Sequence, residues 1–258
     1  MPVAVADQAL HDLVSAPAPR AIEQVIELMQ QIDDCIPNDD GLKWFNRLYL
    51  SVTQQVDLQP VAYWKDPSWL INLDVVFAGF YFRSLAGFLS GDPGAPSSWT
   101  AMFEARYRTG VDRIQFALAG MNAHINHDLA LALLAVDQQT GVVPSPTSPQ
   151  HVDYQLVNTL LNSVMPSALQ MMATDTLGVL AEDTGKVGRL LAFWDICQAR
   201  DLAWDFANHL RDLSGAIRQA ALDAQDQITG VLGRAILSWS TQDLVSNMPR
   251  VATSPNPP

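Results

Sequence analysis

One apolar segment, residues 111–137, constrains the fold more than any other part of the chain. Its aliphatic and alanine residues surround the helical axis at nearly every angle instead of forming one stripe. This pattern is typical of a helix that is buried on all sides. Such a helix needs other helices around it, because every face has to be covered. We therefore predict that residues 111–137 form the buried central helix of an all-α bundle.

The rest of the chain also shows helical periodicity. Apolar residues recur at intervals of three and four, and no run alternates convincingly with the period of two that marks a strand. The pattern predicts a single-domain, multi-helix bundle of about eight to ten helices over residues 1–240, with a disordered tail over 241–258. Besides 111–137, the expected helices are 20–34, 42–57, 67–90, 98–108, 152–173, 176–183, 186–211 and 213–239.

The charge of the chain excludes some partners. A net charge of −12, with no cluster of Lys and Arg, argues against nucleic acid and against an anionic membrane surface. The chain opens without the basic region of a signal peptide, so we expect a cytoplasmic location. Its cysteines, Cys35 and Cys197, lack the CxxC spacing of zinc and redox sites, which predicts free thiols. Nothing in the sequence indicates the oligomeric state.

The most hydrophobic window runs from Trp69 to Leu89 and is long enough to span a bilayer. It also contains Asn72, Asp74 and Arg83. Polar and charged side chains are costly at membrane depth. We therefore expect a buried helix of a soluble protein here, and no membrane span.

Five polar side chains lie within seven residues of the central helix: Asn122, His124, Asn126, His127 and Asp128. Burying such groups without partners is unfavourable, so they either satisfy one another or bind a ligand. On a regular helical wheel His124, His127 and Asp128 point to one side, and the two asparagines form an i,i+4 pair beside them. We expect this polar side to face an internal cavity.

Three interpretations of the polar side remain open. In the first, Asp128 accepts a hydrogen bond from His124 and fixes its tautomer, which leaves the other ring nitrogen free to move a proton. In the second, His124 and His127 bind a divalent metal ion, although no HExxH motif supports this. Carboxylates or imidazoles from other helices would complete that metal site: Asp74, Glu104, Asp205 and His209. In the third, the five groups form a purely structural network.

Several segments together resemble a known family. They are Trp44-Phe45-Asn46-Arg47-Leu48-Tyr49-Leu50, Asp66-Pro67, Leu73-Asp74-Val75-Val76-Phe77-Ala78, and the run from Gln115 to Leu129 that contains Asn-Ala-His-Ile-Asn-His-Asp. Over about residues 20–215 the chain resembles the domain of unknown function 5995, which is common in actinobacteria. That resemblance implies a bacterial setting and the importance of the polar run. It implies no reaction, because the family has no established one.

The favoured hypothesis is a cofactor-independent cyclase or isomerase that acts on a lipophilic small molecule. His124 and Asp128 would move a proton, His127 would be a second acid, and Asn122 and Asn126 would polarise a carbonyl or hydroxyl. A polyketide- or terpenoid-like metabolite from natural-product biosynthesis is the substrate that an actinobacterial setting suggests. The expected substrate-binding residues are Asp74, Trp69, Met121 and Phe77, with Val142–Pro149 as a candidate lid.

Two other hypotheses remain beside it. A metal-dependent hydrolase or oxygenase would use one divalent metal ion held by His124, His127 and Asp74. A non-catalytic small-molecule-binding protein would use the polar side only to orient its ligand. The nucleotide-binding and serine-hydrolase signatures GxGxxG, GxxxxGK[ST] and GxSxG are absent from the sequence.

Overall fold

The computed structural model describes residues 3–174 and 195–238, and every regular element in these two ranges is helical. The helices form a multi-helix bundle, which confirms the predicted all-α fold class. In chain order they are α1 (Gln8–Val14), α2 (Ile22–Cys35), α3 (Leu42–Asp57), α4 (Pro67–Ser90), α5 (Ser97–Ala105), α6 (Arg113–Ala123), α7 (Leu129–Thr140), α8 (Pro149–Thr174), α10 (Ile196–Asp212) and α11 (Gly215–Ser238). The predicted helix 176–183, the start of the predicted helix 186–211 and the tail 241–258 lie outside the described residues.

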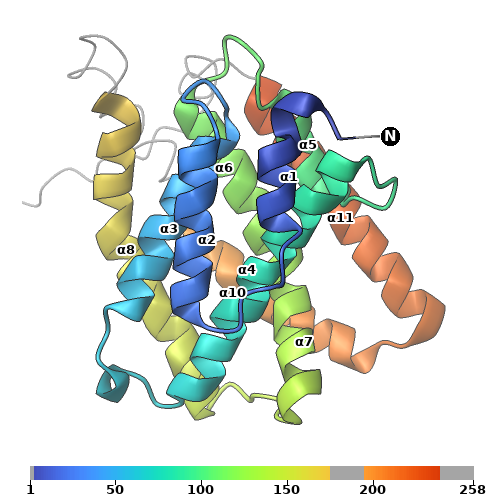
Figure 1. Cartoon of the computed structure of the whole chain (residues 1–258). Helices are drawn as coiled ribbons and strands as arrows, with labels where there is room; N and C mark the ends of the chain where they lie inside the picture. Colours follow the sequence, from blue (N-terminus) through green and yellow to red (C-terminus); the bar gives the residue numbers. More distant parts are fainter. Residues whose placement is uncertain (1–2, 175–194, 239–258) are drawn as a thin grey trace, which may run out of the picture.

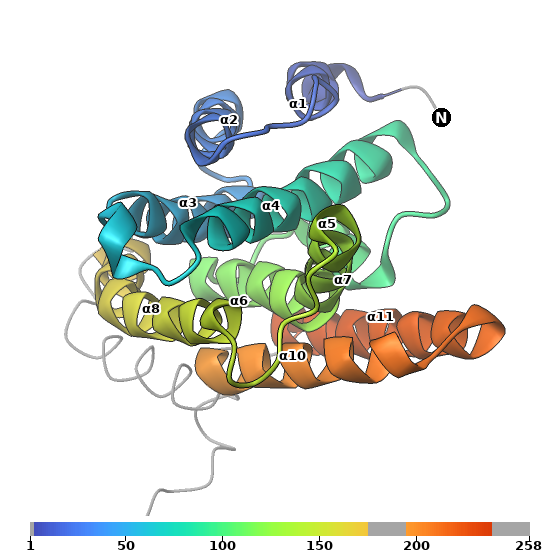
Figure 2. The same cartoon turned by 90° about the horizontal axis from the view of Figure 1, so that it is seen from below.

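The helices are stacked in layers around a central helix, here defined as α6, a π turn and α7 (Figure 1). Figure 2 shows α1 and α2 as one outer layer, α3 and α4 as the next, and α10 and α11 as the layer on the opposite side of the central helix. The packing agrees with this view, because α3 and α4 contact the central helix from one side, and α10 and α11 contact it from the other. The helix α8 closes the edge of the bundle against α3, α4 and α10.

The central helix is buried along most of its length, as its composition predicts. Every residue from Ile114 to Ala123 is buried. The helix begins where the Gln115 side chain accepts a hydrogen bond from the Asp112 backbone N–H, and it ends at Gly141, which has a left-handed φ of 69°. One prediction is wrong: residues 111–137 are not a regular α-helix, because His124–Asp128 form a π turn.

The helix α4 has the predicted bounds, because both of its ends have clear signals. Asp66 accepts a hydrogen bond from the Trp69 backbone N–H at 3.1 Å, Pro67 occupies the first helical position, and Gly91 ends the helix with φ at 72°. Among the described helices, α4 is long and apolar enough to cross a membrane, a test that core helices of bundles also pass. In this structure it packs against α1, α2, α5, α7 and α8.

The first helix, α1, was not predicted. It has only seven residues, and this is too short for a helical period to stand out from the sequence. Leu10 and Val14 bury its inner side, and α1 packs on α2 and α4. Tertiary packing therefore stabilises a segment that has little helical signal of its own.

Gly120 lets Phe45 of α3 pack directly against the central helix, and we expect Gly120→Ala to destabilise the protein. An added Cβ would lie 2.3 Å from Cγ of Phe45, whose ring is buried in the core. Overpacking of this kind costs about 1–3 kcal/mol, measured as the free energy of unfolding in urea. The matched control is Gly87→Ala in α4, where the new Cβ would lie 3.7 Å from Cβ of Asp92. Equal stability of the two variants would contradict this account.

Candidate functional site

A single buried carboxylate, that of Asp128, organises the polar residues of the central helix. Trp99 Nε1 donates to Oδ2 at 2.8 Å, His124 Nδ1 lies 3.0 Å from the same oxygen, and His127 Nδ1 lies 2.8 Å from Oδ1. The expected bond between His124 and Asp128 is confirmed. Because a carboxylate only accepts, both imidazoles carry a proton on Nδ1, and each has its Nε2 left for another role.

The charges of these three groups follow from burial and from the bonds between them. Burial alone would raise the pKa of Asp128, but hydrogen bonds from His124 and His127 outweigh it and lower the pKa. Burial lowers the pKa of His124 and outweighs the attraction of Asp128. Burial also acts on His127, but Asp128 and Asp226 together raise its pKa. At neutral pH Asp128 is therefore ionised and His124 is neutral, with a lone pair on Nε2.

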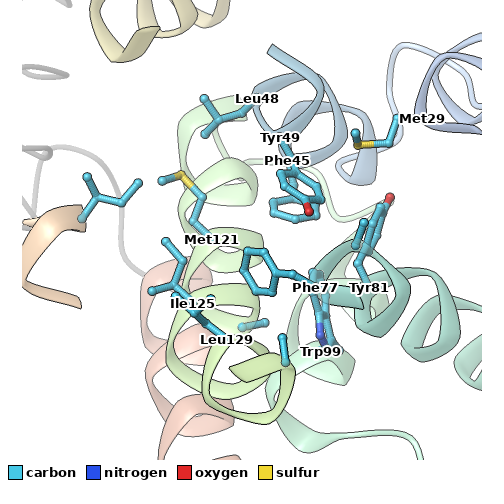
Figure 3. Close-up of a cluster of buried hydrophobic side chains, with 14 of the residues drawn as sticks. Met29, Phe45, Leu48, Tyr49, Phe77, Tyr81, Trp99, Met121, Ile125 and Leu129 are labelled. Atoms are coloured by element: carbon cyan, nitrogen blue, oxygen red, sulfur yellow. The ribbon is translucent and has the colours of Figure 1, made fainter. Parts of the chain in front are cut away.

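His124 faces a cavity of about 70 Å³ that lies between α3, α4, the central helix, α8 and α10. Its Nε2 is buried and has no hydrogen-bond partner within the described residues. The cavity wall is mainly apolar and includes Leu48, Leu73, Phe77, Met121, Ile125 and Leu129. Figure 3 shows Met121 and Ile125 on one side of the central helix, with Leu48 of α3 near them and Phe77 of α4 facing them.

Aromatic rings hold the His124 imidazole in place. The Phe77 ring stacks on it with centroids 3.5 Å apart and planes 7° from parallel. Tyr49 meets it edge to face, with centroids 4.5 Å apart. These contacts and the bond to Asp128 fix both the plane and the direction of the ring. His124 Nε2 is therefore a preoriented base inside an apolar cavity.

Two further polar atoms on this cavity wall are buried. Asp74 Oδ2 has no hydrogen-bond partner within the described residues, and Tyr49 Oη interacts with the Thr53 side chain. Burial raises the pKa of Asp74 to about 7, although Arg200 opposes the effect. Burial also raises the pKa of Tyr49 well above its ordinary value, so the phenol keeps its proton. At pH 7 the cavity therefore combines a base, His124, with the Tyr49 hydroxyl and with Asp74, which is protonated in about half of the molecules and can then donate a hydrogen bond.

The predicted substrate-binding residues do not all lie at the cavity. Asp74, Met121 and Phe77 line the cavity. Trp69 does not line it, and its side chain is buried in the core instead. The segment Val142–Pro149 contributes no lining residue, so the structure gives no support to a lid there.

The polar residues of the central helix, which we expected to face one cavity, lie on two sides of this helix. Asn122 Nδ2 donates to Thr229 O of α11 at 2.9 Å, and Asn126 Nδ2 donates to Asn122 Oδ1 at 2.9 Å. His127 Nε2 lies 3.7 Å from Asp226 Oδ1, also on α11. A regular helix of about 100° per residue already places Asn122 and Asn126 about 160° from His124, and the wider π turn moves His127 further from it. Asn122, Asn126 and His127 therefore do not line the cavity.

The metal hypothesis needs His124, His127 and Asp74 at one point, and the structure does not bring them together. His124 and Asp74 share the cavity, whereas His127 faces α11. In the described ranges, no group of three or more His, Cys, Asp or Glu side chains is placed to hold a metal ion, and this includes Glu104, Asp205 and His209.

Two polar residues of the cavity, Tyr49 and Arg200, were not among the predicted site residues. Tyr49 belongs to the segment Trp44–Leu50 that carries the family resemblance, which was a usable signal. Arg200 lies on the buried side of α10 with Ile196 and Ala203, so an arginine in an apolar stripe was a second signal.

Comparison with known proteins identifies the family and no more. The pattern of the family of unknown function DUF5995 matches residues 22–239, and the chain therefore belongs to this family. A search of curated proteins and a search of solved structures each returned no match.

The buried carboxyl of Asp74 predicts a pH-dependent stability. Its pKa is raised from 3.8 to about 7 in the folded protein, so the unfolded chain releases this proton first as the pH rises. The contribution of Asp74 to the free energy of unfolding is therefore fully present below about pH 4 and is lost as the pH rises to about 7. Asp74→Asn removes this loss, and we expect the variant to be more stable than the wild type by about 1–3 kcal/mol at pH 8. The range allows for the partial exposure of the residue.

The measurement is urea unfolding of wild type and Asp74→Asn at pH 5 and pH 8. The control is Asp223→Asn, which changes an exposed carboxylate on α11. A stability difference for Asp74→Asn that is the same at both pH values would refute the raised pKa.

Proposed function

We propose that this protein is a cofactor-independent isomerase or cyclase that moves protons on a lipophilic small molecule. The observation that carries the proposal is the state of His124. Its Nε2 is buried, neutral and unpaired on an apolar cavity, and its Nδ1 is held by an ionised carboxylate. General bases are prepared for proton abstraction in this way.

The cavity residues support a complete proton-transfer cycle. His124 Nε2 takes a proton from a carbon beside a carbonyl, and the electron pair moves to the carbonyl oxygen. Protonated Asp74 or the Tyr49 hydroxyl donates to that oxygen and stabilises the enol. Asp128 stabilises the imidazolium that forms. In a substrate with a double bond one carbon further along, the enol is conjugated. His124 then returns the proton to the far carbon, the carbonyl re-forms and the double bond moves, without an oxidant, a reductant or a metal ion.

The geometry gives His127 and the two asparagines supporting roles. His127 bonds to Asp128 and acts on the substrate only through that carboxylate. Asn122 and Asn126 bond to each other, and Asn122 also bonds to α11, so they hold the central helix in register. In the proposal, therefore, the asparagines position the helix rather than polarise the substrate.

The size of the cavity limits the part of a substrate that it encloses. Its volume of about 70 Å³ is smaller than the roughly 150 Å³ of an engineered apolar cavity that binds benzene. For a polyketide- or terpenoid-like metabolite, the proposal is that only the reacting end enters. We keep natural-product biosynthesis in a bacterial cytoplasm as the proposed setting, without nucleic acid as a partner.

A metal-dependent hydrolase or oxygenase has less support. Both histidines use Nδ1 for Asp128, and their Nε2 atoms face different surroundings, the cavity for His124 and Asp226 for His127. A non-catalytic binding protein would use the same cavity without proton transfer. The experiment below separates this possibility from the enzyme.

The proposal predicts that the protein catalyses hydrogen exchange at carbon. Short apolar ketones and esters are incubated with it in D₂O, and NMR follows the loss of the α-proton signal. We expect exchange with the wild type, and a decrease of about 100-fold or more in His124→Gln, because the base is lost. Asp128→Asn should also slow exchange strongly, because it removes the charge that stabilises the imidazolium.

The matched control is His151→Gln on α8, a histidine that contacts Trp204 and lies outside the cavity. Its exchange rate should equal that of the wild type. If folded His124→Gln and Asp128→Asn both exchange the substrate as fast as the wild type, the dyad has no catalytic role. Binding of these compounds without any exchange would favour the non-catalytic binding protein.

A further inference from the structure

Arg200 contributes a buried positive charge to the cavity wall. The residue is only 6% exposed. Its Nε donates to Asn158 Oδ1 at 2.7 Å, and its Nη2 donates to the Tyr154 carbonyl oxygen at 2.8 Å. The guanidinium carbon also lies 4.2 Å from the centroid of the Tyr154 ring. These contacts with α8 fix the guanidinium, and Nη1 makes no hydrogen bond within the described residues.

The described part of the chain supplies no carboxylate that pairs with Arg200. The other arginines of low exposure differ: Arg106 pairs with Asp40 and Asp7, and Arg211 pairs with Asp137. A buried cation without a counterion is unfavourable, because desolvation is not offset by attraction. A ligand that brings an anionic group into the cavity would supply the missing counterion.

Asp74 shares the cavity with Arg200 but does not neutralise it. Arg200 attracts Asp74 electrostatically, but no ion pair joins the two side chains, and with a pKa of about 7 Asp74 is only about half ionised at neutral pH. Arg200, Tyr49 and protonated Asp74 line the same small space, and each can donate a hydrogen bond. A carboxylate, which only accepts hydrogen bonds, complements this set.

We infer that the cavity binds a short-chain, otherwise apolar carboxylic acid whose carboxylate pairs with Arg200 and accepts a hydrogen bond from Asp74. The inference deepens the proposed function and rests on it for the chemistry at His124. The carboxylate anchors the end of the ligand that enters the cavity, and the adjoining carbons lie along the apolar wall that also carries His124. As in the proposed function, the cavity of about 70 Å³ encloses only this end. Non-specific carboxylate binding is disfavoured, because the chain carries a net charge of −12.

Pentanoate and pentanamide are the probes, because they have the same chain and shape but differ in charge. Isothermal titration measures their affinities for the wild type. We expect pentanoate to bind about tenfold or more tightly than pentanamide. In Arg200→Gln this preference should disappear, while in Arg200→Lys, which keeps the charge, part of it should remain. The matched control is Arg211→Gln, which alters an arginine of the same helix outside the cavity and should keep the full preference.

Proton linkage gives a second readout. Several titratable groups could contribute to this linkage. They line the cavity or act electrostatically on its polar residues: Asp74, His124, Arg200, Tyr49, Asp57, Asp128, Asp201 and Asp205. Asp74 must be protonated to donate to the bound carboxylate, so pentanoate affinity should fall as the pH rises through about 7. In Asp74→Asn the amide donates at every pH, and the affinity should become independent of pH in this range.

Several outcomes would overturn the inference. They are equal binding of pentanoate and pentanamide, unchanged pentanoate binding by Arg200→Gln, and no binding of any straight-chain acid from acetate to octanoate at millimolar concentrations. If Arg200→Gln does not fold, the comparison of the two probes on the wild type and on Arg200→Lys still tests the inference. The enzyme proposal is judged separately, because His124→Gln keeps Arg200 and should bind pentanoate. Intact binding without α-proton exchange refutes the enzyme alone, and exchange without a preference for carboxylates refutes the inference alone.

Discussion

The buried carboxylate of Asp128 is the interaction on which the rest of the site depends. An ionised carboxylate inside a helical bundle is stable only if donors surround it, and Trp99, His124 and His127 provide them. This requirement fixes the tautomers of both histidines. It also ties α5 to the central helix, because Trp99 comes from α5. The free base in the cavity is therefore a consequence of satisfying a buried charge.

The helix α11 contacts both α5 and the π turn, the two segments that supply the donors of Asp128. Asp226 accepts hydrogen bonds from the backbone N–H groups of Ser97 and Ser98 at the start of α5. Gln225 donates to the Asn126 carbonyl oxygen in the π turn at 2.6 Å. Close contact is possible because Gly230 lies against Ser97, where a Cβ would approach Oγ to 2.5 Å. Both helices that supply the donors of Asp128 are thus held by one neighbour.

Local signals made much of the fold predictable, and tertiary packing decided the rest. The bounds of α4 follow from Asp66, Pro67 and Gly91, and the hydrogen bond between His124 and Asp128 follows from their spacing. The π turn has no signal of its own in one sequence, so the wheel placed His127 on the wrong side. The cavity combines side chains from five separate parts of the chain, and helical periodicity does not say which buried faces meet.

Two imidazoles on one carboxylate link the interior to the outer face of the bundle. When His124 takes up a proton, its positive charge partly offsets the negative charge of Asp128. Asp128 then attracts the His127 ring less strongly. The other nitrogen of that ring lies 3.7 Å from Asp226, whose side chain is 18% exposed. A change of charge at the cavity is thereby transmitted across the central helix to a group in contact with water. The imidazole signals of His127 are accordingly a spectroscopic reporter of the protonation state of His124.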